Sequence, residues 1–182
     1  MIRRKFFILF TFITVFLLTA FFVAPSSHGL RDIRGDGLIT LHNTHLNETA
    51  TVQYRNANGS YNRKGLKEIN HVLRCRQTNK ERKIRVDLLE MVDQIQDHFE
   101  AGQIDVISGY RSKQLNEYLW IIGRKVSRNS PHMYGQAMDI RLQGVKTALL
   151  RDYADNLNRR GGVGYYPSNH FVHVDVGMKR RW

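Results

Sequence analysis

Two short stretches of the chain contain side chains that could bind a metal ion together. Ser130–Asp139 contains His132 and Asp139, and His170–Asp175, about thirty residues later, contains His173. Zinc accepts neutral imidazole nitrogen and carboxylate oxygen, and a catalytic zinc site takes three protein ligands and leaves a fourth position for water. His132, Asp139 and His173 could therefore hold one catalytic zinc ion.

Alternation of apolar and polar residues places two of these ligands on strands. Apolar side chains alternate with Asp139 in residues 136–142, and with His173 and Asp175 in residues 171–176. Successive side chains of a strand point to opposite faces, so these polar residues leave the apolar face. Two such strands side by side bring Asp139 next to His173. Any one of these residues alone would be interpreted as an ordinary polar surface residue. Because the polar residues of both strands lie opposite the apolar face, together they favour an open metal site.

The residues that carry this pattern resemble a known enzyme family. The order Ser-x-His-x-x-Gly-x-Ala-x-Asp, followed by a distal His, is similar to the zinc D-alanyl-D-alanine peptidases, which share their fold with the hedgehog signalling domain. Segments 107–112 (ISGYRS), 134–139 (YGQAMD), 161–167 (GGVGYYP) and 171–175 (FVHVD) resemble the murein endopeptidase K branch more closely. The similarity runs from about residue 38 to residue 182 and is strongest after residue 106.

The resemblance implies an enzyme that hydrolyses peptide bonds in the stem peptides of peptidoglycan, in a branch associated with crosslinks between two diaminopimelate residues. It implies one zinc ion per chain on His132, Asp139 and His173, and makes Arg111 the cation that faces the substrate carbonyl. Arg111 follows the apolar run 104–108 after a Gly-Tyr turn, and functional groups favour such loops. The alternatives are a noncatalytic zinc-containing module that binds the cell wall, and a D,D- or L,D-carboxypeptidase that trims stem peptides.

The general base departs from the family pattern. Related enzymes often carry a Glu three residues before the last His, or a His two residues before it, and these positions here hold His170 and Phe171. His170 and Asp175 are therefore the candidates for the base. Asp175 is preferred because it shares a strand face with His173, whereas His170 would face the other way unless the chain bends there.

The N-terminus predicts export. Residues 1–5 are cationic, and residues 6–23 form an 18-residue apolar run with a few threonines, which is short for a membrane span and long for a signal peptide. We expect residues 1–30 to be an export signal, of the general or twin-arginine type, or a membrane anchor, and residues 31–182 to be one zinc peptidase domain. The domain is expected in the periplasm or cell envelope as a monomer, with membrane contact only through the N-terminal segment.

The charge and the cysteine content argue against other classes. The net charge is +12, and it falls to +9 without residues 1–30, which contain three positive and no negative charges. The basic clusters at 74–76, 80–83 and 179–181 are dispersed, no docking motif accompanies them, and export separates the protein from nucleic acid. An anionic cell-wall polymer or the outer face of a membrane is therefore the better partner. Cys75 is the single cysteine and is expected to be buried rather than bridged.

Periodicity predicts an α+β domain in which helices flank a small antiparallel sheet. The expected strands cover residues 38–42, 50–54, 104–108, 136–142 and 171–176, and the expected helices cover 66–73, 86–99, 113–122 and 145–158. His42 and His45 are remote in the sequence from the three candidate ligands and are expected to be surface residues. The loop 123–130 leads into His132 and is expected to wall the substrate cleft. The Gly-rich segment 161–166 follows a helix, so it is expected to be a closely packed turn and not a phosphate loop.

Overall fold

The structure is a computed structural model that describes residues 35–124 and 126–182. The expected export signal or anchor lies outside the described residues, so the division at residue 30 stays a prediction. In the described part of the chain, no helix combines the length and the apolar character needed to cross a membrane.

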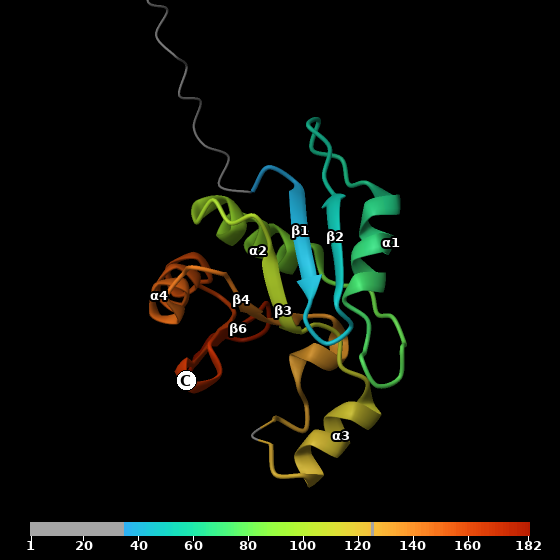
Figure 1. Ribbon diagram of the computed structural model, residues 1–182, viewed down its shortest axis with the longest axis vertical. Coiled ribbons are helices and arrows are strands. Elements are labelled where there is room, and N and C mark those ends of the chain that lie inside the picture. The colour runs from blue at the N-terminus through green and yellow to red at the C-terminus, as the bar shows by residue number, and fades with distance from the viewer. Residues whose placement is uncertain (1–34, 125) are drawn as a thin grey trace, which may run out of the picture. The chain divides into compact units, whose positions relative to one another are not determined.

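Seven strands form one mixed sheet in the order β2-β1-β3-β4-β6-β5-β7 (Figure 1). They are β1 (Leu38–Asn43), β2 (Glu48–Gln53), β3 (Ile104–Ser108), β4 (Ala137–Arg141), β5 (Gly162–Tyr166), β6 (Phe171–Asp175) and β7 (Arg180–Arg181). Most neighbours are antiparallel, but β1 pairs with β3, and β5 with β7, in parallel. The predicted α+β class is confirmed, and the sheet is mixed rather than wholly antiparallel.

Two details of the sheet differ from the sequence prediction. Residues 161–166, expected as a turn, contain β5, which pairs with β6 along its length. The strand at 171–175 is also not the last one, because β7 adds to the outer edge of β5. Glycines contribute no apolar alternation and β7 has only two residues, so neither strand carries the periodicity that reveals a strand in a sequence.

Four α-helices and two short 3-10 helices complete the domain. They are α1 (Arg63–Val72), α2 (Val86–His98), α3 (Lys113–Ile121), η1 (Pro131–Tyr134), α4 (Thr147–Leu157) and η2 (Pro167–Asn169). α1 begins where the Asn62 side chain accepts hydrogen bonds from the backbone of Lys64 and Gly65. α3 begins in the same way, because Ser112 Oγ accepts from the backbone N–H of Leu115.

The hydrophobic core packs one face of the sheet against α1, α2 and α4. Met138 and Ile140 of β4 and Val172 and Val174 of β6 are completely buried in it. Because side chains alternate along a strand, the residues between them leave the sheet on the opposite face. This alternation determines where Asp139 and His173 lie.

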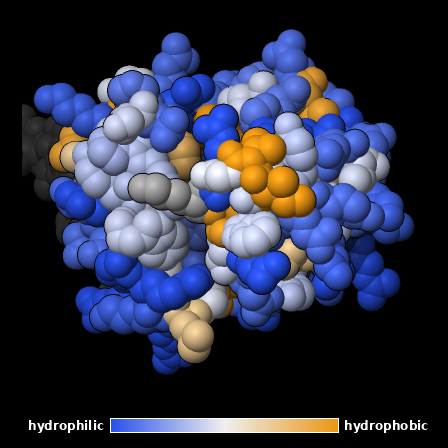
Figure 2. Space-filling view, turned by 90° about the horizontal axis from the view of Figure 1, so that it is seen from below, coloured by the Kyte–Doolittle hydropathy of each residue, from blue (hydrophilic) through white to orange (hydrophobic). Residues whose placement is uncertain are grey.

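α3 stands apart from this core. Of its residues only Leu115 and Asn116 are buried, and its C-terminal end exposes Trp120, Ile121 and Ile122. Figure 2 looks at the molecule from the α3 end and shows a hydrophobic patch within a largely hydrophilic surface. α3 and the loop that follows it therefore form a wall separate from the main helix layer.

Candidate metal centre and active-site cleft

Strands β4 and β6 place Asp139 and His173 opposite each other. The two residues are partners in the antiparallel ladder, and His173 Nδ1 lies 2.8 Å from Asp139 Oδ1. η1 brings His132 to the same point, with its Nε2 3.3 Å from Asp139 Oδ1 and 3.2 Å from His173 Nδ1. All three residues are more than nine-tenths buried. The three residues named from the sequence thus meet in one cluster.

The second nitrogen of each imidazole has a fixed partner. His132 Nδ1 lies 2.8 Å from the carbonyl oxygen of Gly109, which can only accept, so Nδ1 carries the proton and Nε2 presents a lone pair to the cluster. His173 Nε2 lies 3.0 Å from Asp175 Oδ2, which leaves Nδ1 for the cluster. Such outer partners orient histidine ligands in metal sites. Two imidazole lone pairs and a carboxylate are a donor set that zinc accepts, so the residues fit a metal ion.

Burial and the shared carboxylate shift the protonation of the cluster. Burial lowers the pKa of His132. Burial also disfavours charge on His173, but hydrogen bonds to Asp139 and Asp175 outweigh it and raise the pKa of His173 to about 9. Burial alone would raise the pKa of Asp139, yet the charge and hydrogen bonds of His132 and His173 hold it well below its ordinary range. At neutral pH without a metal, a proton on His173 therefore supplies positive charge that a divalent cation would supply instead.

Asp175 is completely buried behind His173. Its Oδ1 accepts from the backbone N–H groups of Gly162 and Gly177 at 3.1 and 2.8 Å, and its Oδ2 contacts His173 Nε2 and, at 2.9 Å, Arg180 Nη2. Burial opposes ionisation, but these hydrogen bonds, chiefly that from His173, lower the pKa of Asp175 to about 2. Both oxygens are occupied, so this carboxylate is placed to orient His173.

The backbone around Asp175 leaves no room for side chains. A Cβ atom on Gly161 or Gly162 would overlap Asp175. Asn158, which follows α4, fastens the same region because its Nδ2 donates to the carbonyl oxygens of Gly162 and Asp175 at 3.1 and 2.9 Å. This packing agrees with the interpretation of the glycines as residues of close backbone approach.

His170, the other candidate base, is exposed at the end of η2. It has a left-handed backbone with φ of 54°, so the chain does bend there. Its neighbours Asn169 and Phe171 line the cleft described below, whereas neither His170 nor Asp175 does so. His170 therefore lies at the rim of the cleft, on the solvent side, while Asp175 lies behind the metal cluster.

Arg111 is buried, in contrast to an ordinary surface arginine. Its backbone N–H donates to the carbonyl oxygen of His132 at 3.2 Å, and its Nη2 donates to Ser108 Oγ at 3.2 Å and lies 3.6 Å from Asp139 Oδ2. Burial lowers the pKa of Arg111, and the charge of Asp139 opposes this. The guanidinium is thus a fixed positive charge beside the candidate metal ligand.

A cleft of about 840 Å³ opens in front of the cluster. His132, Asp139 and His173 line it, together with Gly123, Arg124, Val126, Ser127 and Ser130 of the loop that was expected to form its wall. On the other side Trp182 packs its ring 5.1 Å from that of His173 and donates from Nε1 to Tyr166 Oη at 2.7 Å. The cluster is therefore reachable by a substrate, as a catalytic metal site requires.

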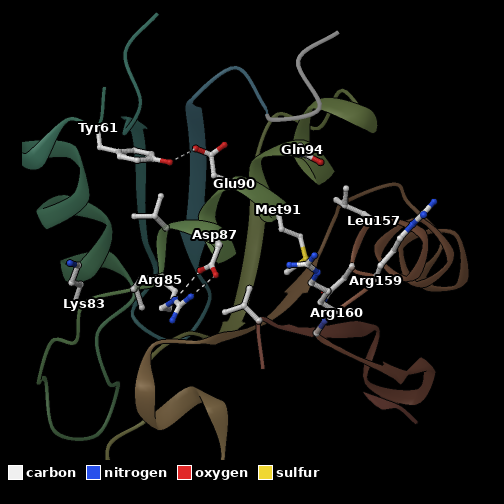
Figure 3. A pocket seen from close by; sticks show the side chains of 15 residues that line it. Tyr61, Lys83, Arg85, Asp87, Glu90, Met91, Gln94, Leu157, Arg159 and Arg160 are labelled. Carbon is white, nitrogen blue, oxygen red and sulfur yellow. Dashed lines mark hydrogen bonds and ion pairs between the residues drawn. The ribbon is translucent and has the colours of Figure 1, made fainter. Parts of the chain in front are cut away.

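A second cavity, of about 990 Å³, lies between α2 and the connection from α4 to β5 (Figure 3). Its lining includes the apolar Met91 and Leu157 and the ion pair between Arg85 and Asp87, whose atoms lie 2.6 Å apart. None of its lining residues is a histidine or a member of a potential metal-binding group. Donor chemistry, rather than size, therefore selects the smaller cleft as the candidate active site.

One more group of possible metal ligands occurs among the described residues, formed by Asp36, Asp93 and Asp97. Asp93 Oδ2 accepts from the backbone N–H of Gly37 at 2.9 Å and from Tyr54 Oη at 2.7 Å. Burial raises the pKa of Asp93 to about 6. This group contains carboxylates alone and is distant in the sequence from the histidines, so we assign it no part in the chemistry.

Sequence reasoning missed several residues of the cleft. Arg76 and Arg124 line it, and so does His45, which was expected to be an ordinary surface residue. His45 is exposed, as expected, but the β1–β2 turn carries it to the cleft, where its Nε2 contacts Arg76 Nη1. These residues come from three separate segments, and no spacing rule links them. Cys75 is buried, as expected, and its Sγ lies 3.3 Å from Ser112 Oγ.

Comparison with known proteins agrees with this geometry. The family described as Peptidoglycan L,D-endopeptidase MepK matches residues 33–182. The chain is 35% identical over 146 residues to the Peptidoglycan L,D-endopeptidase MepK of Escherichia coli (strain K12), which covers 80% of this chain and 79% of the relative. It is 34% identical over 147 residues to the Probable peptidoglycan L,D-endopeptidase MepK of Haemophilus influenzae, which covers 80% and 78%. No solved structure gives a significant match. With the match extending over nearly the whole described domain, the chain belongs to the peptidoglycan L,D-endopeptidase MepK family.

Proposed function

We propose that the protein is a zinc-dependent endopeptidase that hydrolyses peptide crosslinks of peptidoglycan, including links between two diaminopimelate residues. The observation that carries the proposal is the convergence of His132 Nε2, Asp139 Oδ1 and His173 Nδ1 at the floor of an open cleft. Membership of the family and the names of its relatives support the substrate class.

In this proposal His132, Asp139 and His173 hold one zinc ion. A bound zinc ion polarises the scissile carbonyl and lowers the pKa of water to about 7. Arg111 supplies a second, fixed positive charge to the carbonyl oxygen as negative charge develops there, because it lines the cleft and its guanidinium lies 3.6 Å from Asp139 Oδ2. Its burial keeps water from screening that charge.

The two candidate bases take different roles. Asp175 holds the proton of His173 Nε2 and so keeps Nδ1 available as a ligand, which is an orienting role. His170 is exposed and lies between two residues that line the cleft, and we assign it the role of accepting a proton and passing it to the leaving amine. The bend at His170 makes this ranking the reverse of the one that strand phase alone favours.

The location follows from the same proposal. A peptidoglycan hydrolase must reach the cell wall, and the cationic start and apolar run of residues 1–23 provide an export signal or an anchor. We infer that the domain works in the periplasm or cell envelope. Protease added to spheroplasts should digest it, and a domain protected until the cells are lysed would contradict export.

The direct test is digestion of purified crosslinked muropeptide dimers by the zinc-loaded protein, followed by chromatography and mass spectrometry. Separated monomers are expected, with activity lost on chelation and restored by zinc. His132→Ala, prepared in the same way, is the inactive control. Dimers that persist while a terminal residue is removed would favour a carboxypeptidase, and binding of the dimers without any cleavage would favour a noncatalytic module.

A further inference from the structure

Arginines dominate the charge of the cleft. Its lining contains Arg74, Arg76, Arg111, Arg124 and Arg180, against the single carboxylate Asp139. A cleft with such an excess of one charge favours ligands of the opposite sign. The five arginines differ, however, in whether the protein itself already neutralises them.

Three of these arginines have carboxylate partners. Arg74 binds Glu48 through two hydrogen bonds of 2.6 and 2.7 Å. Arg180 lies 2.9 Å from Asp175 Oδ2, and Arg111 lies 3.6 Å from Asp139 Oδ2. These three arginines contact carboxylates of the protein itself, so their charge is partly neutralised within the protein.

Arg76 and Arg124 have no carboxylate partner among the described residues. The side chain of Arg76 contacts the Nε2 atom of His45, which is exposed to solvent but loses part of its hydration at this contact. This desolvation and the charge of Arg76 lower the pKa of His45, so the ring stays neutral and cancels no charge. Arg124 lies on the cleft wall after α3. Both arginines line the same cleft. Desolvation and the charge of Arg124 lower the pKa of Arg76, and the charge of Cys75 opposes them.

We propose that Arg76 and Arg124 form a carboxylate-binding subsite that holds a free carboxylate of the crosslinked peptide beside the scissile bond. The inference rests on the proposed function and specifies how its substrate is recognised. A diaminopimelate residue has two carboxyl groups and uses at most one of them in the crosslink, so a charged carboxylate flanks the bond that is cut. The planar fork of an arginine matches a carboxylate, and an anion placed between two like charges removes their repulsion.

The subsite contributes binding rather than chemistry. The proposed function assigns Arg111 and the metal centre to the reacting carbonyl, whereas Arg76 and Arg124 approach the cleft from the segment before α2 and from the end of α3. An interaction made equally with substrate and transition state lowers KM and leaves kcat unchanged. The expected signature of losing either arginine is therefore a higher KM.

The kinetic test compares Arg76→Ala, Arg124→Ala and the wild type, all zinc-loaded full-length protein, on two muropeptide dimers that differ only in amidation of the free diaminopimelate carboxylates. Each variant should lose about 10- to 100-fold in kcat/KM on the carboxylate dimer, through KM, as expected for lost hydrogen bonds to a charged group. The kcat/KM of the wild type should fall by a similar factor when the dimer is amidated, whereas the kcat/KM of the variants should change little. Arg76→Lys should recover part of the loss.

Arg128→Ala is the matched control. It removes the same charge from the same loop, but the Arg128 guanidinium stacks on the Trp120 ring at 4.3 Å and does not line the cleft. Its KM should stay within about twofold of the wild type, because an exposed charge outside the subsite contributes little. Equal increases in KM for Arg128→Ala and Arg124→Ala would show that the effect comes from the net positive charge of the protein, and would overturn the proposal.

A binding measurement separates this inference from the proposed function. Calorimetry with the uncrosslinked stem peptide, its amidated form and inorganic phosphate reports the subsite without turnover. If binding depends on the carboxylate and both Arg→Ala variants weaken it, the subsite is supported. If the protein also cleaves no dimer, only the proposed function fails. Three results would overturn the carboxylate subsite. The first is binding that amidation or both substitutions leave unchanged, the second is binding of phosphate in preference to the carboxylate peptide, and the third is no binding at all.

Discussion

His173 Nε2 and Asp175 Oδ2 lie 3.0 Å apart at the end of β6, and this contact determines which nitrogen of His173 faces the other ligands. The carboxylate is anchored by two backbone N–H groups, so it cannot turn away when the metal site is empty. The orientation of the imidazole is consequently built into the fold, so the proposed metal site needs no rearrangement of His173 before an ion binds.

Asp175→Asn should weaken zinc binding by about 10- to 100-fold, the usual cost of losing an outer partner of a histidine ligand. The amide keeps the size of the side chain but removes the charge that stabilises the His173 Nε2–H group. Competition with a chromophoric chelator measures the affinity. His170→Ala is the comparison, because this exposed residue should leave zinc affinity unchanged; equal loss in both variants would contradict the orienting role.

His132→Ala, Asp139→Ala and His173→Ala should each abolish stoichiometric zinc, since a site with two protein ligands holds the ion poorly. Elemental analysis after dialysis against buffered zinc measures the content. Circular dichroism should show that the fold persists. One of these variants retaining a full equivalent of zinc would show that its residue is not a ligand.

His170→Ala should lower kcat on muropeptide dimers by about 10²- to 10⁴-fold with zinc content retained, because a general base typically contributes that much. If kcat is unchanged, proton transfer does not pass through His170. If kcat falls only in zinc-saturated Asp175→Asn, Asp175 is the general base instead.

Arg111→Ala should reduce kcat by about 10²- to 10³-fold, the range found for removing a charge-stabilising donor at a reacting carbonyl. Arg111→Lys should restore part of the rate, because it restores the charge but not the two-pronged geometry. Steady-state kinetics of zinc-saturated protein measure both. An effect on KM alone would move Arg111 from the reacting carbonyl to substrate binding.

The stability of the metal-free protein should fall as the pH rises from 7 to 9. The pKa of His173 is about 9 in the fold against 6.5 as a free side chain, so the charged ring stabilises the fold fully below pH 6.5 and loses that contribution as the pH passes 9. At about 1.4 kcal/mol per pKa unit, the loss is at most roughly 3 kcal/mol.

Urea denaturation with a chelator present measures this dependence, and His173→Gln should flatten it. Zinc-loaded protein should not show the fall, because the ion then supplies the positive charge at every pH in this range. A metal-free protein that gains stability over the same interval would contradict the assigned protonation of His173.

The meeting of Asp139 and His173 could be predicted because it depends on strand alternation, which is visible in the sequence. Strand alternation places Asp139 and His173 on one face, and the two are found as ladder partners. The bend at His170 and the burial of Asp175 under Arg180 depend on η2 and β7, which have no periodic signal in the sequence. Strand alternation therefore predicted that Asp175 lies near His173, but it could not show that Asp175 lies behind the ring, away from the cleft.

The cationic lining of the cleft could not be predicted for a different reason. Arg76, Arg124 and His45 come from loops whose positions depend on how the β1–β2 turn, the segment before α2 and α3 meet in space. In the sequence each looks like one more basic residue in a chain of net charge +12. Only the tertiary structure distinguishes the arginines that already have a carboxylate from those that do not.

The packing of Trp182 against His173 has a practical consequence for producing the protein. Trp182 also accepts a hydrogen bond at its carbonyl oxygen from the backbone of Tyr165 at 2.8 Å, so residue 182 is fixed within the wall of the cleft. A polyhistidine tag fused after this residue begins beside the metal cluster and offers it competing imidazoles. Metal stoichiometry measured on such a fusion would count the tag as well as the protein, so a cleavable or histidine-free handle is the appropriate choice.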